Sequence, residues 1–495
     1  MCCGARCASA TWPWRLSSRA TPTTHMPPAD SRCCRDRATC SLTRLARWRR
    51  WKAATASASC GLISRREPRR KRIDPVTTLA NAWFPALAEP QVRRYLMGQG
   101  ASILGTWMLD ITLNLLVWQL TRAPAMLGVL NFLLYGPGLL VTPLVSPRLH
   151  AGNARRVTLW VLMAALAVAV ALTAAALLDW LTLPVLFVAA AARGVLGGME
   201  VPSRQMLLVN ISPDDSRLGS VIAMNTVVFL LARTSGPGLA ALMFEPLGPG
   251  CAFALAAGGL LFMLHCVVRL RVRSQEHPSA RGQPAPTGLR GAWEFVRQDR
   301  FGSLFLPVAA AVGLCVGAYQ TLVPVLADRT FGDANRWTGW FFAAAGGGAL
   351  VAALLLSSRY LDTLLRRFLL LVPWSGVVAL AVLAVSSHVA ATLAAFAVLG
   401  FCTSFVGTGT NATLHRRAPP EARGGLIALF LLAFVGVMPF AQLLAGLLAQ
   451  WLPLGATFAV LAVLLCTALT ALYGARWRRQ GSLELDLATS EGRHS

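Results

Sequence analysis

Long apolar segments separated by short polar loops make up most of this chain from residue 95 to residue 474. Each apolar segment has about 20 residues or more, so that as a helix it crosses about 30 Å of hydrocarbon. The predicted spans are residues 95–120, 125–147, 157–178, 182–203, 219–244, 249–268, 302–327, 337–358, 367–386, 389–412, 424–449 and 453–474. The pattern predicts an all-α polytopic membrane protein with twelve transmembrane helices.

One polar stretch, residues 269–301, divides the spans into two groups of six. Its first part is rich in Pro, Gly and Ser, which is typical of a flexible linker. Leu289, Ala292, Trp293 and Val296 then recur at helical spacing, which predicts a short amphipathic helix on the membrane surface. The predicted organisation is an N-terminal half at 79–268, a cytoplasmic linker at 269–301, a C-terminal half at 302–475 and a cytoplasmic tail at 476–495.

Residues 1–78 differ from the rest of the chain, because they carry 17 Lys and Arg against 4 Asp and Glu and hold seven of the 12 cysteines. They contain no apolar run of the length that a signal peptide needs. The cysteine spacings fit no zinc pattern, so we expect no metal. Two interpretations remain, a disordered, solvated cytoplasmic extension or a mis-assigned start with translation beginning near Val76.

Composition supports a membrane protein and excludes other classes. The chain is 55% hydrophobic and only 14% charged, whereas about a quarter of the residues of a soluble domain are charged. Its net charge of +25 comes partly from the N-terminal extension and partly from loops between apolar spans, so it does not indicate nucleic-acid binding. After residue 78, 24 of the 29 arginines lie on one side of the predicted spans and three on the other. The positive-inside rule therefore places both termini in the cytoplasm, with the spans in the plasma membrane.

The two halves share short sequence features at equivalent places. The pair Arg155–Arg156 opens the third span, and the pair Arg366–Arg367 opens the ninth. A Pro-x3-Arg-x-Gly pattern follows the fourth span at 213–219 and the tenth span at 419–425. Such internal repetition is typical of transporters built from two related halves.

Over residues 90–475 the chain resembles the major facilitator superfamily of transporters. Within it, the chain is most similar to the bacterial branch that contains the enterobactin exporter and macrolide-efflux proteins. The residues that carry this similarity are Gly105-Thr106-Trp107-Met108, Pro202-Ser203-Arg204-Gln205, Leu207-Leu208-Val209, Leu218, Asn225, Arg233, Gly236 and Pro237. The resemblance implies the major facilitator fold and transport by alternating access.

The superfamily's loop signature is incomplete in the first half, where only Arg155 and Arg156 remain of its Gly, Asp-Arg and paired-arginine pattern. The equivalent loop in the second half keeps Asp362 with Arg366 and Arg367. An Asp at this place can pair with arginines or with a helix N-terminus. The resemblance therefore implies a cytoplasmic latch that lies mainly in the C-terminal half.

Gly236 and Pro237 in the fifth span match, in part, the motif that the superfamily associates with antiporters. Pro removes a helix hydrogen bond and Gly permits close packing, so the pair is predicted to bend the helix and seal the transport path, or to be an ordinary transmembrane kink. Arg233 precedes this pair. We interpret it as a structural residue that satisfies loosened backbone there, with a functional role as the alternative.

Charges inside spans are the most informative residues, because each costs about 2.5–3.5 kcal/mol at a helix centre. Asp110 in span one, Arg193 in span four and Glu200 nearer the cytoplasmic end of span four are the candidates for proton coupling. Arg204 shares the helix face of Arg193 and Glu200. The resemblance implies that spans one and four line a central cavity, where burial favours a neutral Asp110 and a nearby Arg193 favours a charged one. The alternative is a permanent Asp110–Arg193 ion pair that only fixes packing.

Aromatic and amide side chains in the predicted cavity spans suit a bulky amphipathic molecule, although each alone is common in helix packing. These candidates are Trp107, Trp118, Tyr135, Tyr319, Phe401 and Phe405, with Asn114, Gln320, Thr408 and Asn411.

No nucleotide-binding loop or catalytic constellation occurs in the sequence, so we expect neither ATP-driven pumping nor an enzyme. The main hypothesis is a monomeric, proton-coupled exporter of a small organic molecule such as a siderophore, antibiotic or secondary metabolite. It needs no cofactor and binds no nucleic acid; its partners are the substrate, the proton and the bilayer. The alternatives are a ligand sensor with a transporter fold and a facilitator of a lipid or metabolite without proton coupling.

Overall fold

The computed structural model describes residues 89–150, 152–212, 215–270, 288–299, 301–357, 361–417 and 423–491, and every regular element in them is helical. The predicted N-terminal extension and most of the predicted linker lie outside the described residues. Twelve helical segments in the described part are long and apolar enough to cross a membrane, which confirms the spans that the hydropathy pattern predicts.

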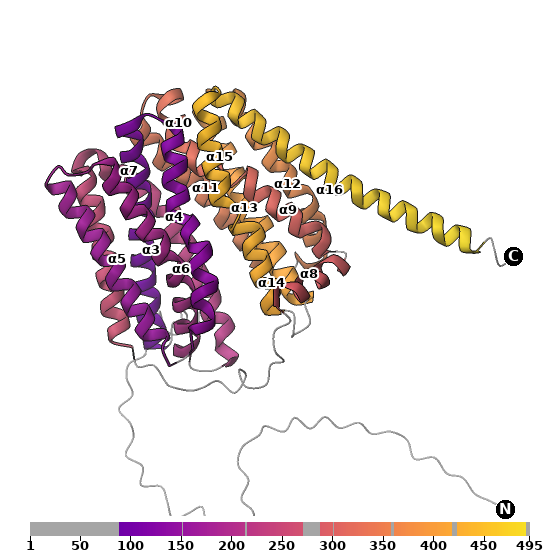
Figure 1. Ribbon diagram of the computed structural model, residues 1–495, viewed down its shortest axis with the longest axis horizontal. Helices are drawn as coiled ribbons and strands as arrows, with labels where there is room; N and C mark the ends of the chain where they lie inside the picture. Colours follow the sequence, from indigo (N-terminus) through magenta and orange to yellow (C-terminus); the bar gives the residue numbers. More distant parts are fainter. Residues whose placement is uncertain are drawn as a thin grey trace, which may run out of the picture. The chain divides into compact units, whose positions relative to one another are not determined.

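The first six spans form one group of neighbouring helices (Figure 1). Spans five and six are a single element whose backbone leaves helical angles at Gly248, with φ 73° and ψ 172°. Only glycine adopts this conformation without steric cost. The elements of this group are α3 (Pro90–Thr121), α4 (Pro124–Val145), the short 3₁₀ turn η2 (Ser146–Arg148), α5 (Ala154–Leu177), α6 (Leu183–Ile211) and α7 (Asp215–Val268).

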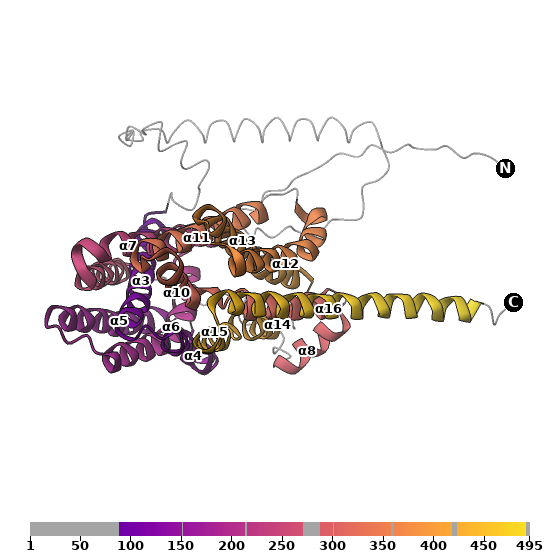
Figure 2. The ribbon, with the colours of Figure 1, turned by 90° about the horizontal axis from the view of Figure 1, so that it is seen from above.

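The last six spans form a second group, coloured orange to yellow in Figure 1. Two of these spans consist of more than one element. The elements are α9 (Gly302–Cys315), α10 (Tyr319–Phe331), α11 (Ala334–Ser357), α12 (Leu361–Val385), α13 (Val389–Arg417), α14 (Arg423–Phe430), the π-helical turn η4 (Leu431–Val435), α15 (Met438–Trp451) and α16 (Leu454–Glu491). The helix of α16 continues well beyond the predicted twelfth span (Figure 2).

Spans seven and eleven are interrupted near each other, which the hydropathy pattern does not predict. Span seven changes from α9 to α10 through a turn at residues 316–318, and span eleven contains the π-helical turn η4. A Cβ atom added to Gly313, just before the first interruption, would lie 2.7 Å from the carbonyl oxygen of Phe434 in η4. The two irregular segments are therefore in direct contact.

The first span of each group is its most buried one. In both α3 and the α9–α10 span, 72% of the most apolar window is buried inside the protein. Figure 2 shows α3 among α4, α6 and α7. Polar side chains on these two spans are therefore placed among protein neighbours rather than toward lipid.

Glycines set the close approach of several helix pairs. A Cβ at Gly105 of α3 would lie 2.8 Å from the Cα of Ala256 in α7. The two groups also meet through glycine, because a Cβ at Gly446 of α15 would lie 2.8 Å from the Cα of Gly128 in α4. Small residues of this kind let transmembrane backbones approach, where van der Waals packing and not the hydrophobic effect holds helices together.

Polar contacts join the two groups at the end of the bundle where α3 ends and α4 begins. Arg122 pairs with Asp328, which follows α10's apolar part, with 2.6 Å between Nη1 and Oδ2. Nearby, the amide nitrogen of Gln119 donates to the amide oxygen of Asn335 over 3.3 Å. These contacts connect the two halves outside the apolar core.

The amphipathic segment after the linker is a helix, α8 (Gly288–Gln298), as predicted. Ala292 and Val296 are buried, whereas Trp293 is half exposed. Directly after the helix, Asp299 pairs with Arg417 at the end of α13, with 3.0 Å between Oδ1 and Nη1. One apolar face of α8 thus packs on the second half of the protein.

Adjacent glycines in α11 provide a matched test of this packing. A methyl group at Gly348 would overlap the carbonyl oxygen of Ala397 in α13, whereas one at Gly347 would meet no atom within 4 Å. We expect Gly348→Ala to lower the free energy of unfolding by about 1–3 kcal/mol through overpacking. Gly347→Ala should leave it unchanged or raise it, because Ala is the better helix former. Thermal unfolding of both variants in detergent measures the difference, and equal stability of the two would contradict this packing.

Candidate functional site

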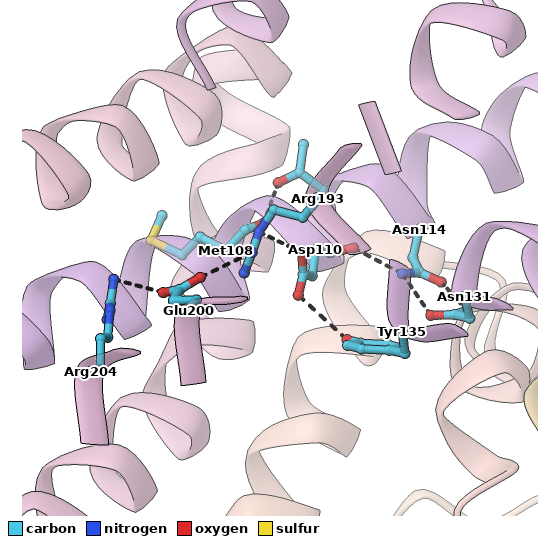
Figure 3. A network of polar contacts seen from close by, with 9 residues as sticks. Met108, Asp110, Asn114, Asn131, Tyr135, Arg193, Glu200 and Arg204 are labelled. Atoms are coloured by element: carbon cyan, nitrogen blue, oxygen red, sulfur yellow. Dashed lines mark hydrogen bonds and ion pairs between the residues drawn. The ribbon is translucent and has the colours of Figure 1, made fainter. Parts of the chain in front are cut away.

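Four charged side chains form a continuous row between α3 and α6 (Figure 3). Asp110 of α3 lies 4.0 Å from Arg193 of α6, measured from Oδ1 to Nε. Arg193 Nη1 lies 3.3 Å from Glu200 Oε2, and Glu200 Oε1 lies 2.6 Å from Arg204 Nη2. Two carboxylates and two guanidinium groups therefore alternate, and their formal charges sum to zero.

Helix periodicity explains this arrangement. Residues 193, 200 and 204 are spaced by seven and four positions, so they lie on one face of α6, as the sequence predicts. Arg204 is anchored from the other side by α3, because it donates to Gln99 Oε1 over 2.9 Å and to Ser102 Oγ over 2.8 Å. The sequence assigns Arg204 to a motif, but not to this charge network.

Asp110 is less well paired than Glu200. Both oxygens of Glu200 contact a guanidinium group, and its side chain is 13% exposed. Among the described residues, Asp110 has only the distant Arg193 as an ionic partner, and its Oδ2 accepts a 3.4 Å hydrogen bond from the hydroxyl of Tyr135. Its Oδ1 is buried and accepts no hydrogen bond. Since a buried charge is costly unless it is well paired, Asp110 is the carboxylate of the network with the weakest compensation.

A second, uncharged network begins one helical turn away on α3 (Figure 3). Asn114 donates to the carbonyl oxygen of Asp110, and Asn131 of α4 donates to Asn114 Oδ1, each over 2.8 Å. Asn131 also lies 3.3 Å from the hydroxyl of Thr321 in α10. The amide network thus extends from the charged row to the second half of the protein.

The interpretation of Arg233 as a residue that satisfies the backbone near Gly236 and Pro237 stays a prediction, and the structure adds an aromatic contact. Its guanidinium carbon lies 5.2 Å from the ring centre of Trp107 in α3, in a cation–π arrangement. The hydroxyl of Tyr319, at the start of α10, lies within reach of the same guanidinium. Arg233 therefore faces aromatic side chains from both halves.

Gly236 has the packing role that the sequence predicts for it. A Cβ at this position would lie 2.7 Å from the Cβ of Trp107, so α7 approaches α3 only because the residue is glycine. The backbone angles of α7 stay helical through Gly236 and Pro237. The Pro237 side chain lies outside the described part of the structure.

The other candidates for substrate contact do not all lie together. Tyr135 lies beside the charged row, Trp107 lies against the guanidinium of Arg233, and Gln320 of α10 accepts a 3.0 Å hydrogen bond from Gln442 of α15. Two candidates are fully buried in helix packing and are not grouped with these residues: Trp118, with Arg122 and Arg329 over its ring, and Phe405, between Phe368 and Phe401. Thr408 is exposed and Asn411 is partly exposed on α13.

Of the gating candidates, Arg155 has a defined contact. It donates to the carbonyl oxygens of Val267 and Val268, over 3.3 and 2.6 Å, at the end of α7. The last carbonyls of a helix have no partner within it, so Arg155 caps the sixth span. Arg156 is exposed. The side chains of the predicted latch, Asp362, Arg366 and Arg367, lie outside the described residues.

Several residues of the site have no assignment from the sequence. They are single polar side chains inside apolar spans, and this is the signal by which they can be found. They are Gln99, Ser102, Asn131, Thr321 and Gln442.

The sequence is similar to known families of membrane transport proteins. The family model described as transmembrane secretion effector matches residues 81–491. An uncharacterized MFS-type transporter, y4rN, of Sinorhizobium fredii is 25% identical over 48% of this chain and 58% of its own length. The staphyloferrin A transporter of Staphylococcus aureus is 23% identical over 46% of this chain and 57% of its own length. The chain thus spans less than two thirds of the length of these relatives.

Solved structures of transporters share the fold. The nucleoside transporter NupG has a TM-score of 0.59 at 13% identity, over 78% of this chain and 98% of its own. The human organic anion transporter MFSD10 has a TM-score of 0.54 at 16% identity, over 77% of this chain and 99% of its own. At such identities the similarity concerns the fold alone.

The alternating charges predict a compensating pair of substitutions. Arg204→Gln leaves two carboxylates with one guanidinium group, so we expect the free energy of unfolding to fall by about 3 kcal/mol. Adding Glu200→Gln returns the remaining charges to zero and should recover part of the loss. Thermal unfolding in detergent measures both, and a double variant no more stable than the single one would contradict the network.

Proposed function

We propose that this chain, which belongs to the transmembrane secretion effector family of the major facilitator superfamily, is a proton-coupled exporter of small amphipathic organic molecules. It works by alternating access, with a substrate site between the two halves. It lies in the plasma membrane with both termini in the cytoplasm, as the distribution of arginines favours. Siderophores, antibiotics and secondary metabolites are the substrate classes considered, and the likeness to the staphyloferrin A transporter supports the first of these.

The observation that carries this proposal is the incomplete pairing of Asp110. A carboxyl group that carries protons must be stable in both its neutral and its charged form, and neighbours must change between the two states. A carboxylate with two close guanidinium groups, such as Glu200, is held charged. Asp110 has an arginine at 4.0 Å and a buried oxygen without a hydrogen bond, so a small movement of Arg193 is enough to favour either form.

Coupling to transport follows from the position of Asp110. Its backbone carbonyl accepts from Asn114, and the amide network continues through Asn131 to Thr321 of the second half. Rocking of the halves breaks or remakes the link to Thr321 and thereby disturbs the surroundings of Asp110. One proton that enters across about 100 mV supplies about 2.3 kcal/mol for this change.

The proposal predicts the loss of proton movement in Asp110→Asn, which keeps the shape of the side chain and removes its titration. The substrate is first identified as a compound that leaves wild-type cells and not a gene-deletion strain. In proteoliposomes with a pH-sensitive dye, we expect proton flux driven by this substrate to fall at least about tenfold in the variant. Asp179→Asn is the matched control, because Asp179 is exposed at a turn with φ 56°, a conformation that Asn tolerates.

Other outcomes of this experiment identify the alternatives. Full substrate-driven proton flux in Asp110→Asn would make the Asp110–Arg193 contact a permanent structural pair. Binding of the compound without transport would favour a sensor, and transport that is indifferent to a proton uncoupler would favour a facilitator.

Alternating access predicts that a covalent link across the contact between the halves stops transport. In a background without other cysteines, Gln119→Cys and Asn335→Cys place two thiols where the amide groups now lie 3.3 Å apart. Treatment with a short thiol-reactive linker should abolish nearly all transport, and reductant should restore it. Each single-cysteine variant, treated in the same way, should transport normally. Unchanged transport by fully linked protein would rule out separation of the halves at this end.

A further inference from the structure

Arg233 is a charged side chain inside a predicted span, but it is not part of the network of paired charges between α3 and α6. The row of Asp110, Arg193, Glu200 and Arg204 is neutral in itself. Among the side chains that the structure describes, no carboxylate pairs with Arg233. A lone guanidinium within a span costs at least about 2.5 kcal/mol, so such residues usually serve a binding or transport role.

The surroundings of Arg233 have the chemistry of an anion site for aromatic or apolar molecules. Its guanidinium lies over the ring of Trp107 and beside the hydroxyl of Tyr319. A phenol hydroxyl and a guanidinium can both donate hydrogen bonds to an oxyanion. The indole ring offers a flat apolar face to the remainder of the molecule.

The backbone near Arg233 contains a glycine contact and a helix interruption. Gly236, one turn after Arg233, lets α7 lie against Trp107. Tyr319 is the first residue of α10, directly after the interruption of span seven. In transporters, interrupted helices of this kind commonly border substrate sites. Residues from spans one, five and seven, and therefore from both halves, meet at Arg233.

We propose that Arg233 binds a carboxylate group of the transported molecule, with Tyr319 as a further donor and Trp107 against its apolar part. This inference rests on the proposed export function and adds the substrate class, namely amphipathic organic carboxylates. The bound anion supplies the negative charge that the protein lacks at this place. Because the donors come from both halves, the carboxylate also links the halves while it is bound.

The first test measures stability without any ligand. Arg233→Gln removes an uncompensated charge together with its contact to the Trp107 ring, so the unfolding temperature of the detergent-purified full chain should fall less than in Arg204→Gln, or rise. Arg204→Gln breaks a paired charge and serves as the control. A fall in Arg233→Gln at least as large as that of the control would show that the guanidinium has an acidic partner and would overturn the proposal.

The second test measures binding by equilibrium dialysis with two probes of nearly equal shape, naphthalene-2-carboxylate and its neutral amide. Wild type should bind the carboxylate at least about tenfold more tightly than the amide. Arg233→Gln should lose this preference and bind the amide as before, and Arg233→Lys should keep part of the preference because it keeps the charge.

Equal binding of the two probes by wild type, or no detectable binding of the carboxylate below about 10 mM, would overturn the proposal. So would a preference that survives in Arg233→Gln. These measurements need neither transport nor a proton gradient, so their failure is distinct from failure of the export proposal. Carboxylate binding through Arg233 without export in cells would reject the export function and leave the site in place.

Discussion

The cost of placing charged and polar groups away from water is the constraint on which this structure depends. Within the first half, two acids and two arginines alternate along the contact between α3 and α6, so that each charge has an opposite neighbour. Uncharged polar side chains are also paired, because Asn131 forms hydrogen bonds with Asn114 and with Thr321. This pairing is incomplete at Asp110 and at Arg233, the residues to which we assign proton coupling and carboxylate binding.

The structure also depends on close packing between helices. The polar groups can meet only because glycines let α3, α7 and α4 approach their neighbours, as at Gly105 and Gly236. Residues of the two most buried spans, α3 and α9–α10, take part in the polar contacts between the halves, as Gln119 and Thr321 do. Polar side chains also lie on less buried spans, since α6 carries Arg193, Glu200 and Arg204 on the face that meets α3.

The sequence predicted the spans well because hydropathy over about 20 residues depends on the bilayer and not on the partners of each helix. It also identified Asp110, Arg193 and Glu200, because a charge in an apolar span stands out. It did not predict that Arg193 lies closer to Glu200 than to Asp110, or that Arg233 stacks on Trp107. Helix periodicity gives the face of one helix, but contacts between helices depend on their rotation and spacing, which glycine packing determines.

Aromatic residues were the least predictable group for the same reason. Phe405 and Tyr319 lie in equally apolar sequence and are both buried in aromatic packing, yet Tyr319 also lies beside Arg233. The interruptions of spans seven and eleven were also not predicted, because Gly317 and the residues of η4 do not lower the hydropathy of their spans. Such breaks are a property of two helices in contact rather than of either sequence alone.

The two polar links between the halves differ in their response to dissolved salt. Arg122 and Asp328 form an ion pair in which the arginine side chain is 61% exposed, so mobile ions screen its attraction within a Debye length of about 8 Å at physiological ionic strength. The hydrogen bond from Asn131 to Thr321 is buried and joins neutral groups, so ions in solution have little effect on it. A rise in salt concentration therefore loosens the pair between Arg122 and Asp328 and leaves the hydrogen bond between Asn131 and Thr321 intact. In a halophilic or osmotically stressed environment the contact between Arg122 and Asp328 is therefore weakened, while the contact between Asn131 and Thr321 does not depend on the medium.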